Sequence, residues 1–338
     1  MKVNKRIFLT MLGVVVTVLV LGSAFVFWPR SPKDHPGKMA SIAIGGAISD
    51  SGALIFTAED QRFFMANGIR LTQKDYDTGL AAIDGLLNNE IDLARAGEYP
   101  VVVKAFGNSG IRIIGSHSRS FNEYVVGRVD KGIRNEADLK GKKVGLPRRA
   151  LPDFYLGRFL NLHGMSIRDV ALTNLTPKQT VGAIANGTVD AVVVWEPYVS
   201  QIREQLTNRI LIWSAHSGQA QYSVLVGRSE WIRQHPNLVK GILTSLAQAE
   251  EYTVQHPTEA MAILKKRYQH DDAYVARVWK EHQFSLSLDQ SLILAMEDEA
   301  RWMIRNNLTN EKTVPDFGNY IFTDALKAIK PEAVNIIR

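Results

Sequence analysis

The chain has 338 residues, of which 46% are hydrophobic and 22% are charged, and its formal net charge is +6. This length suffices for about two domains, and the composition is that of a globular protein rather than a disordered one. The absence of cysteine excludes disulfides, thiolate catalysis, zinc–thiolate sites and lipid attachment at cysteine. Basic residues are dispersed, which favours a solvated surface over a nucleic-acid-binding one.

The N-terminal segment differs in kind from the rest of the chain. Ile7–Trp28 is uncharged, and as a helix it would span about 33 Å, enough to cross a bilayer. Gly22-Ser23-Ala24 is only a weak cleavage site, so we expect residues 1–28 to be an uncleaved signal anchor, with a cleaved signal peptide as the alternative. The apolar segment has three basic residues on each side, so the positive-inside rule does not set its orientation. The charge of the α-amino group slightly favours an N-terminus on the cytoplasmic side. Residues 29–38, with three prolines, predict a stiff linker.

From Met39 onward, short apolar runs alternate with segments of helical periodicity. The strands expected in the first series are Ala40–Ile44, Ile69–Asp75, Ile91–Ala96, Ile111–Ser116 and Glu123–Val129. The helices expected between them are Ala53–Asn67, Leu80–Asn88 and Tyr99–Phe106. This alternation predicts an α/β fold with a mostly parallel sheet and helices on both faces.

A second series with the same alternation begins near Asp130. Its expected strands are Lys143–Leu146, Val170–Leu175, Val189–Val194, Ile210–Trp213 and Tyr222–Gly227. Its expected helices are Asn135–Leu139, Pro152–His163, Pro177–Asn186 and Pro197–Leu206. The strands that begin at Glu123 and Tyr222 both end in Gly-Arg, and two similar strands that bracket one domain predict a hinge with two crossings.

The chain after Ser229 predicts helices only. Val239, Ile242, Leu243 and Leu246 share one face of the first of them, the spacing of an amphipathic helix. The expected helices are Pro236–Val254, Glu259–Tyr268, Asp272–Glu281, Asp289–Asn306 and Thr323–Ala328. We expect this block to pack back onto one of the two α/β lobes.

One sequence motif occurs twice in the chain. At a constant offset of 98 positions the first copy matches the second, in the pairs Asn88/Asn186, Asp92/Asp190 and Glu98/Glu196. Each copy follows a helix-like segment and gives a short apolar run that ends in Glu. The repeat predicts that Glu98 and Glu196, with Gly97 and Trp195 beside them, end equivalent strands in two facing lobes.

Established motifs for chemistry are missing. The sequence has no Gly-rich nucleotide-binding motif, no nucleophile elbow and no metal-binding helix motif, and its eight histidines are scattered. We therefore expect no cofactor, no metal and no catalytic residue, although a triad formed only in three dimensions stays an alternative.

Ligands of open α/β sheets bind beyond the carboxyl ends of the strands, so the polar residues there are candidates. In the first series the candidates are Ser49, Asp50, Ser51, Thr78, Gly97, Glu98 and Ser116. In the loop after the first strand, small residues ahead of a helix would suit an anion, and an ordinary capped loop is the alternative. Thr78 has the same two readings, a helix cap or a cleft residue.

In the second series the candidates are Arg148, Arg149, Trp195 and Glu196. Two arginines beside a helix N-terminus would clamp an anion, with solvated surface charges as the alternative. Trp195 would wall a pocket or pack in the core. Glu196 could accept a hydrogen bond from a ligand ammonium or hold an arginine.

The chain resembles the periplasmic solute-binding proteins of ABC importers, in the branch for nitrate, aliphatic sulfonates, taurine and thiamine-type pyrimidines. The residues that carry the resemblance are Asp138–Pro147, Val189–Tyr198, Asn89–Asp92 with Gly97–Pro100, and the tail from His235 to Pro257. It covers about Met39 to Phe322. The resemblance implies a two-lobed clamshell of the type II class that closes on a small solute by a hinge motion.

Lobe 1 would comprise residues 39–122 and 222–338, and lobe 2 residues 123–221. The resemblance further implies a small-molecule solute, a permease and an ATPase as partners, a monomer, and no nucleic acid. The helix of residues 1–28 would hold the protein by a single pass to the outer face of the inner membrane, with the N-terminus inside.

The resemblance has one departure that bears on the ligand. Many relatives carry Gly, Ser or Thr where this chain has Arg149-Ala150-Leu151, so the usual hydroxyl contact to a sulfonate is missing and an arginine would replace it. We therefore expect capture of a small anionic solute, such as a sulfonate, taurine or nitrate. The alternatives are a receptor for a thiamine-precursor pyrimidine, a membrane-tethered ligand sensor, and an enzyme on the same fold.

Overall fold

The computed structural model describes residues 39–216 and 218–337. The predicted anchor at residues 1–28 and the linker at residues 29–38 therefore lie outside the described residues. Within the described ranges, none of the helices is both long enough and apolar enough to cross a membrane.

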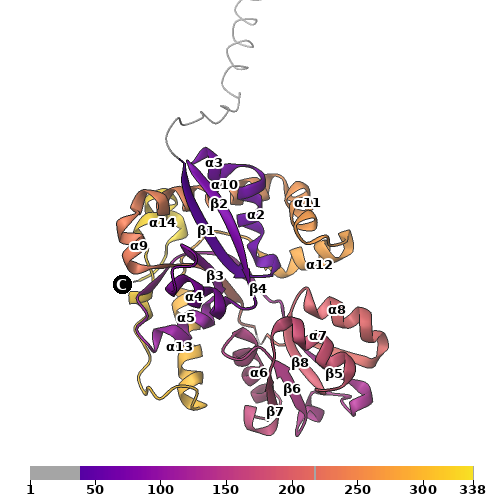
Figure 1. Cartoon of the computed structure of the whole chain (residues 1–338). Coiled ribbons are helices and arrows are strands. Elements are labelled where there is room, and N and C mark those ends of the chain that lie inside the picture. The colour runs from indigo at the N-terminus through magenta and orange to yellow at the C-terminus, as the bar shows by residue number, and fades with distance from the viewer. Residues whose placement is uncertain (1–38, 217, 338) are drawn as a thin grey trace, which may run out of the picture. The chain divides into compact units, whose positions relative to one another are not determined.

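Two separate sheets organise the described part of the chain (Figure 1). The first has six strands in the order β11-β4-β10-β3-β1-β2. Their bounds are β1 (Ala40–Ala47), β2 (Ile69–Tyr76), β3 (Leu93–Gly97), β4 (Ile111–Ser120), β10 (Gln221–Arg228) and β11 (His282–Gln283). The second has five strands in the order β7-β6-β8-β5-β9. Their bounds are β5 (Glu123–Arg128), β6 (Lys143–Leu146), β7 (Ala171–Asn174), β8 (Ala191–Trp195) and β9 (Ile210–Ser214).

Helices connect the strands and cover the sheets. Those of the two α/β series are α2 (Ala53–Asp60), α3 (Phe63–Ala66), α4 (Gly79–Leu87), α5 (Glu98–Ala105), α6 (Leu151–Leu162), α7 (Pro177–Asn186) and α8 (Tyr198–Leu206). The C-terminal block adds α9 (Ser229–Gln234), α10 (Pro236–Gln255), α11 (Pro257–Tyr268), α12 (Asp272–Glu281), α13 (Gln290–Arg305) and α14 (Asp324–Ile329).

Both sheets combine parallel and antiparallel pairs in a corresponding way. In the first sheet β1 pairs in parallel with β2 and β3, and β10 runs antiparallel to β3. In the second sheet β6 pairs in parallel with β7 and β8, and β5 runs antiparallel to β8. The chain crosses between the sheets twice, from β4 to β5 and from β9 to β10. The two crossings predicted from the matching Gly-Arg strands are therefore present.

The Asp residue of the repeat, Asp92 in the first copy and Asp190 in the second, explains why the same motif occurs in both sheets. An Asp92 side-chain oxygen accepts a hydrogen bond from the Ala43 amide of β1 at 2.8 Å. The Asp190 carboxylate accepts in the same way from the Lys143 amide of β6 at 2.9 Å. In each case the Asp precedes a buried strand and ties it to its parallel neighbour, so this half of the repeat is structural.

The apolar pattern predicts the packing of α10 correctly. Val239, Ile242, Leu243 and Leu246 are all fully buried, on the face that the spacing indicates. Around the second sheet, α7 and α8 close a separate apolar cluster that contains Val126, Ile184, Val192 and Ile202.

Three details of the sequence-based prediction are wrong. The sheets are not mostly parallel, because β10 runs antiparallel to β3 and β4, and β5 runs antiparallel to β8 and β9. The helix expected over Ala53–Asn67 is interrupted, because α2 ends at Asp60 and Arg62 takes a left-handed conformation with φ of 60° before α3 begins. The block after Ser229 is not purely helical, because His282 and Gln283 add the short strand β11 beside β4. A two-residue strand is too short to give an alternating pattern in the sequence.

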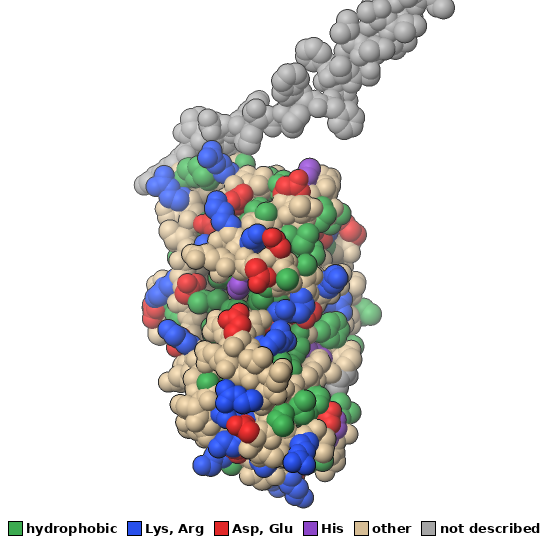
Figure 2. Space-filling model, turned by 90° about the vertical axis from the view of Figure 1, so that its right-hand side faces the viewer, with side chains coloured by type: hydrophobic (Ala, Val, Ile, Leu, Met, Phe, Trp, Pro, Cys, Tyr) green, Lys and Arg blue, Asp and Glu red, His purple; other side chains and the backbone are tan. Residues whose placement is uncertain are grey.

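The surface carries charges of both signs. On the face in Figure 2, Lys and Arg side chains are spread among Asp and Glu side chains and do not gather in one patch. This distribution matches the dispersed basic residues of the sequence.

Candidate ligand-binding site

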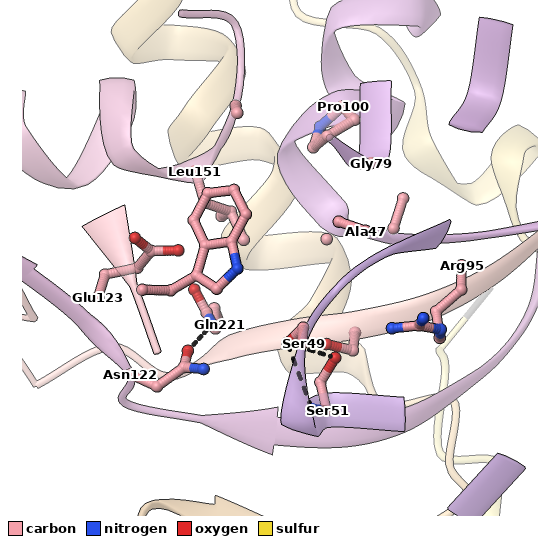
Figure 3. A pocket seen from close by; sticks show the side chains of 15 residues that line it. Ala47, Ser49, Ser51, Gly79, Arg95, Pro100, Asn122, Glu123, Leu151 and Gln221 are labelled. Atoms are coloured by element: carbon pink, nitrogen blue, oxygen red, sulfur yellow. Dashed lines mark hydrogen bonds between the residues drawn. The ribbon is translucent and has the colours of Figure 1, made fainter. Parts of the chain in front are cut away.

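A small cavity lies between the ends of strands from the two sheets (Figure 3). It holds about 60 Å³, and one water requires roughly 10–15 Å³ on this measure, so it has space for a handful of water-sized groups. The first-sheet elements contribute Ala47, Ser49, Ser51, Gly79, Arg95, Ala96, Gly97, Pro100, Gln221 and Ser223. Residues from the first crossing onward contribute Asn122, Glu123, Ala150, Leu151 and Trp195.

Strand ends place these residues, as expected for an α/β sheet. Strand β1 ends at Ala47 and β3 at Gly97, and the two strands run in parallel so that their carboxyl ends meet at one edge. On the other side of the cavity Glu123, which begins β5, pairs with Trp195, which ends β8.

Arg95 is the dominant electrostatic feature of the wall. Arg95 is only 6% exposed. Within residues 39–216 and 218–337, its guanidinium group forms no hydrogen bond and no ion pair. The group instead lies over the Phe56 ring, 5.6 Å from the ring centroid. Burial, with the Arg95 charge as a second cause, lowers the pKa of His117 to about 3. A buried charge without a partner is costly, so this cavity favours an anion.

Gly46 makes room for Arg95 on the neighbouring strand. The two residues are partners in the parallel register of β1 and β3. A Cβ atom at Gly46 would lie 2.9 Å from the Arg95 carbonyl oxygen and 3.1 Å from its guanidinium carbon. A side chain at position 46 would therefore displace the strand or the guanidinium group.

Ser49 and Ser51 lie on the same wall as Arg95. The Ser49 hydroxyl donates to the Ser51 hydroxyl at 3.1 Å and accepts from the Ser51 amide at 3.3 Å. Both residues stand at the short 3-10 helix Asp50–Gly52, between β1 and α2. The Ser51 hydroxyl keeps its proton and is suited to donate a hydrogen bond to an anion held by Arg95.

Asp50 and Thr78 have other partners and do not line the cavity. The Asp50 carboxylate is fully buried and accepts from the Tyr274 hydroxyl at 2.5 Å, with His270 Nε2 at 3.6 Å. Thr78 caps α4 by accepting from the Ala81 amide at 3.1 Å, the first of the two readings expected for it.

The two repeated glutamates do not line the cavity either. Glu98 is fully buried and accepts from the Tyr222 amide at 3.0 Å. Glu196 accepts from the Ser200 amide at 2.9 Å and from the Ser200 hydroxyl at 3.1 Å, in the first turn of α8. Both carboxylates thus accept hydrogen bonds from the protein itself, so this pair of the sequence repeat has a structural role.

The remaining polar candidates of the strand ends also lie outside the wall. Ser116 is buried within β4, where its hydroxyl donates to the Ser118 carbonyl oxygen at 3.4 Å. Arg148 forms an ion pair with Asp153 at 2.9 Å. Arg149 has φ of 59° and borders a different hollow. The structure does not bring the two arginines together as an anion clamp, because Asp153 in the first turn of α6 holds this loop by the Arg149 amide as well.

Four of the predicted residues do meet at the cavity: Ser49, Ser51, Gly97 and Trp195. The Trp195 indole is 8% exposed and donates to the Ile48 carbonyl oxygen at 3.2 Å, which ties the end of β8 to the loop after β1. Gly97 has no side chain and admits Leu151, whose Cδ1 would lie 2.4 Å from a Cβ at that position.

Sequence reasoning missed Arg95, Asn122, Glu123, Gln221 and Ser223. One signal was available for Arg95, which interrupts an otherwise apolar strand. The position that matches it in the second copy of the repeat is Val193, so a charge there is not needed to build the strand. Asn122, Glu123 and Gln221 stand at the two crossings, and only the fold brings the crossings together.

A second contact also joins elements of the two sheets. Arg277 of α12 lies 2.9 Å from the Glu196 carboxylate and 2.8 Å from the Ser200 hydroxyl. The Glu196 side chain is 1% exposed and the Arg277 side chain is 37% exposed. Together with the hydrogen bond from Trp195 to Ile48, this ion pair gives two polar contacts between elements of the two sheets.

Arg277→Met should weaken closure. It removes the cation beside Glu196 while Ser200 still satisfies part of that carboxylate, so the closed arrangement loses stability relative to an open one. A ligand held between the two sheets would bind most tightly when they are closed, so we expect the Kd of such a ligand to rise by about 10-fold. Titration calorimetry measures this change. Lys280→Met, at an exposed position of the same helix, is the matched control, and equal affinities for the two variants would contradict the closing role of Arg277.

The two sheets, the double crossing and the cavity between strand ends define the periplasmic-binding-protein fold. The alkanesulfonate-binding protein SsuA of Xanthomonas axonopodis pv. citri, solved with MOPS bound, has a similar structure, with a TM-score of 0.75 at 19% identity over 85% of this chain and 99% of that one. This likeness confirms the α/β fold expected from the sequence.

A protein-family model described as NMT1/THI5-like matches residues 51–260, and the chain belongs to this family. It is 23% identical to a putative aliphatic sulfonates-binding protein of Bacillus subtilis, over 82% of this chain and 85% of the relative. It is 24% identical to the taurine-binding periplasmic protein of Escherichia coli, over 59% of this chain and 62% of the relative. These relatives confirm the resemblance to periplasmic solute-binding proteins.

Proposed function

We propose that this chain is the solute-binding component of an ABC importer and captures a small anionic solute, such as a sulfonate, taurine or nitrate, in the cavity beside Arg95. The single observation that carries the proposal is the buried guanidinium group without a protein partner. A bound anion would supply that partner, and the Ser51 hydroxyl would add a hydrogen bond to it. The protein would act by binding and release, without covalent chemistry.

The remaining parts of the proposal concern organisation. Lobe 1 would comprise residues 39–122 and 222–338, and lobe 2 residues 123–221, with a boundary at each crossing between the sheets. The binding site would consist of Ser49, Ser51, Arg95, Gly97 and Trp195, with Asn122, Glu123 and Gln221 from the crossings. The protein would work as a monomer with a permease and an ATPase, on the extracytoplasmic side, tethered by residues 1–28.

A ligand screen by thermal shift tests the solute class. The full chain in detergent is heated with alkanesulfonates, taurine, nitrate or an uncharged pyrimidine. A solute present at 100 times its Kd stabilises the folded protein by about 2.7 kcal/mol, so a true ligand raises Tm clearly. A shift with an anion supports the proposal. A shift with the pyrimidine alone would favour a receptor for a thiamine precursor, and no shift with any anion would contradict the proposal.

Two further measurements test the placement. N-terminal sequencing of the membrane-bound protein should start at Met1, and a start near Phe25 would instead show a cleaved signal peptide. Addition of the loaded protein to its permease and ATPase in vesicles should stimulate ATP hydrolysis. Binding of the loaded protein to a kinase-like partner in place of an importer would indicate a sensor.

A further inference from the structure

The cavity is polarised along its length, and one end holds hydrogen-bond acceptors that lack donors. Glu123 is 2% exposed, and its Oε2 atom has no partner in the described part of the chain. The Gln221 side chain is also buried, and its Oε1 atom has no donor within the same residues. Both side chains line the cavity. Buried acceptors of this kind are costly unless a ligand donates to them.

The other atoms of these two residues are used by the protein. The Glu123 amide donates to His216 Nε2 at 3.1 Å, and its carbonyl oxygen accepts from the Ala215 amide at 2.9 Å. The Gln221 amide group donates to the Ser120 hydroxyl at 3.0 Å and to the Asn122 side chain. These bonds fix the backbone of Glu123 and the amide orientation of Gln221, which leaves the Glu123 Oε2 and Gln221 Oε1 acceptors for a ligand.

The opposite end of the cavity holds donors. Arg95 supplies the guanidinium group, and Ser49 and Ser51 supply hydroxyls. In Figure 3 Glu123 and Arg95 lie at opposite sides of the view, with Asn122, Gln221 and the two serines between them. An anion beside Arg95 therefore leaves the acceptors near Glu123 to a different part of the same solute.

We propose that the solute is a small zwitterion, whose anionic group binds at Arg95 and whose ammonium group donates to Glu123 and Gln221. This inference rests on the proposed function and narrows it, because a plain anion such as nitrate or an alkanesulfonate offers nothing to the acceptor end. An ammonium group has three donors and a positive charge, so it matches a carboxylate and an amide oxygen of two residues that line the same cavity.

The electrostatics around Glu123 agree with this assignment. Burial, and secondarily the charge of Glu98, raise the pKa of Glu123 well above its ordinary range. A ligand cation in contact would oppose that shift and favour the ionised carboxylate. The exposed lysines and arginines of the surface cannot take this role, since the Glu123 side chain is buried.

Pairs of ligands that share a carbon chain and an anionic group, and differ by the amino group, test the inference. Titration calorimetry on the full chain in detergent compares taurine with ethanesulfonate, and β-alanine with propionate. We expect taurine to bind at least 30-fold more tightly than ethanesulfonate. In Glu123→Gln the ratio should fall to within about threefold, because the neutral amide no longer pairs with the ammonium group. Glu204→Gln, at an exposed position of α8, should keep the wild-type ratio.

The possible results separate the two proposals. Equal binding of taurine and ethanesulfonate by the wild type would overturn the zwitterion and leave anion capture in place. A folded Glu123→Gln variant that keeps the wild-type preference for taurine would also overturn it. If neither sulfonate binds, the carboxylate pair fails as well and nitrate gives no thermal shift, capture of a small anion itself is wrong. The unfolding temperature of each variant without ligand shows that it is folded.

Discussion

Arg95→Met should abolish solute binding without loss of stability. The guanidinium group is buried and has no protein partner, so its removal takes away an unfavourable buried charge while the methionine keeps most of the apolar contact with Phe56. Loss of one partner of a desolvated ion pair costs roughly 2–5 kcal/mol, so we expect the Kd of the anionic solute to rise by about 100-fold or more. Calorimetry and thermal unfolding with and without ligand measure both parts.

The predicted loss of binding and the predicted unchanged stability control for each other. The Tm of the unliganded Arg95→Met protein should equal or exceed that of the wild type, and its ligand-induced shift should vanish. Arg70→Met, an exposed arginine on the adjacent region of the same sheet, should change neither quantity. Arg95→Lys should bind with intermediate affinity, since the charge stays but the two-pronged donor geometry is lost. A clear drop in the unliganded Tm of Arg95→Met would indicate a structural role for the arginine.

Glu98→Gln should make the protein more stable at alkaline pH and less sensitive to pH. Burial raises the pKa of Glu98 from about 4.5 to about 8, and bonds to the Tyr222 amide offset only part of that effect. Between these values the unfolded chain releases a proton that the folded protein retains. The free energy of unfolding therefore falls as pH rises through this window, by up to about 1.4 kcal/mol per pH unit for this group.

Glutamine keeps the size of Glu98 and can still accept from the Tyr222 amide. We expect Tm of Glu98→Gln at pH 8 to exceed that of the wild type by about 5 °C, with a small difference at pH 4.5. Part of the slope should remain, because burial also raises the pKa values of Glu123 and Glu299, and the substitution does not change that burial. Glu332→Gln, at an exposed residue, is the control. Parallel Tm curves for wild type and Glu98→Gln would contradict the buried acid.

Periodicity predicted the fold well, because the elements are set by burial on a local scale. The α10 stripe and the strands around Asp92 and Asp190 needed only the pattern of apolar residues and the polar residues that flank it. Where a local conformation decides the boundary, as at the left-handed Arg62, composition gives no signal. The domain boundaries at the crossings stay predictions.

The site was harder to predict because the ends of strands attract polar residues for two different reasons. Ser49, Ser51 and Trp195 stand there and face the cavity. Glu98 and Glu196 stand there too, yet they bond to backbone amides and an arginine of the chain itself. Sequence spacing is the same in both cases, and only the direction of the side chain separates them. Arg95 was hidden for the opposite reason, since it lies inside a strand rather than after it.

The hydrogen bonds among Ser120, Asn122 and Gln221 join the two crossings to each other. Because these bonds join the crossings, we expect the two crossings to bend together when the sheets move relative to each other. Asn122 and Gln221 also line the cavity, so a solute bound there would touch the residues that link the crossings. Under a hinge motion of this kind, a small change in the contacts of the solute would give larger displacements at residues farther from the crossings.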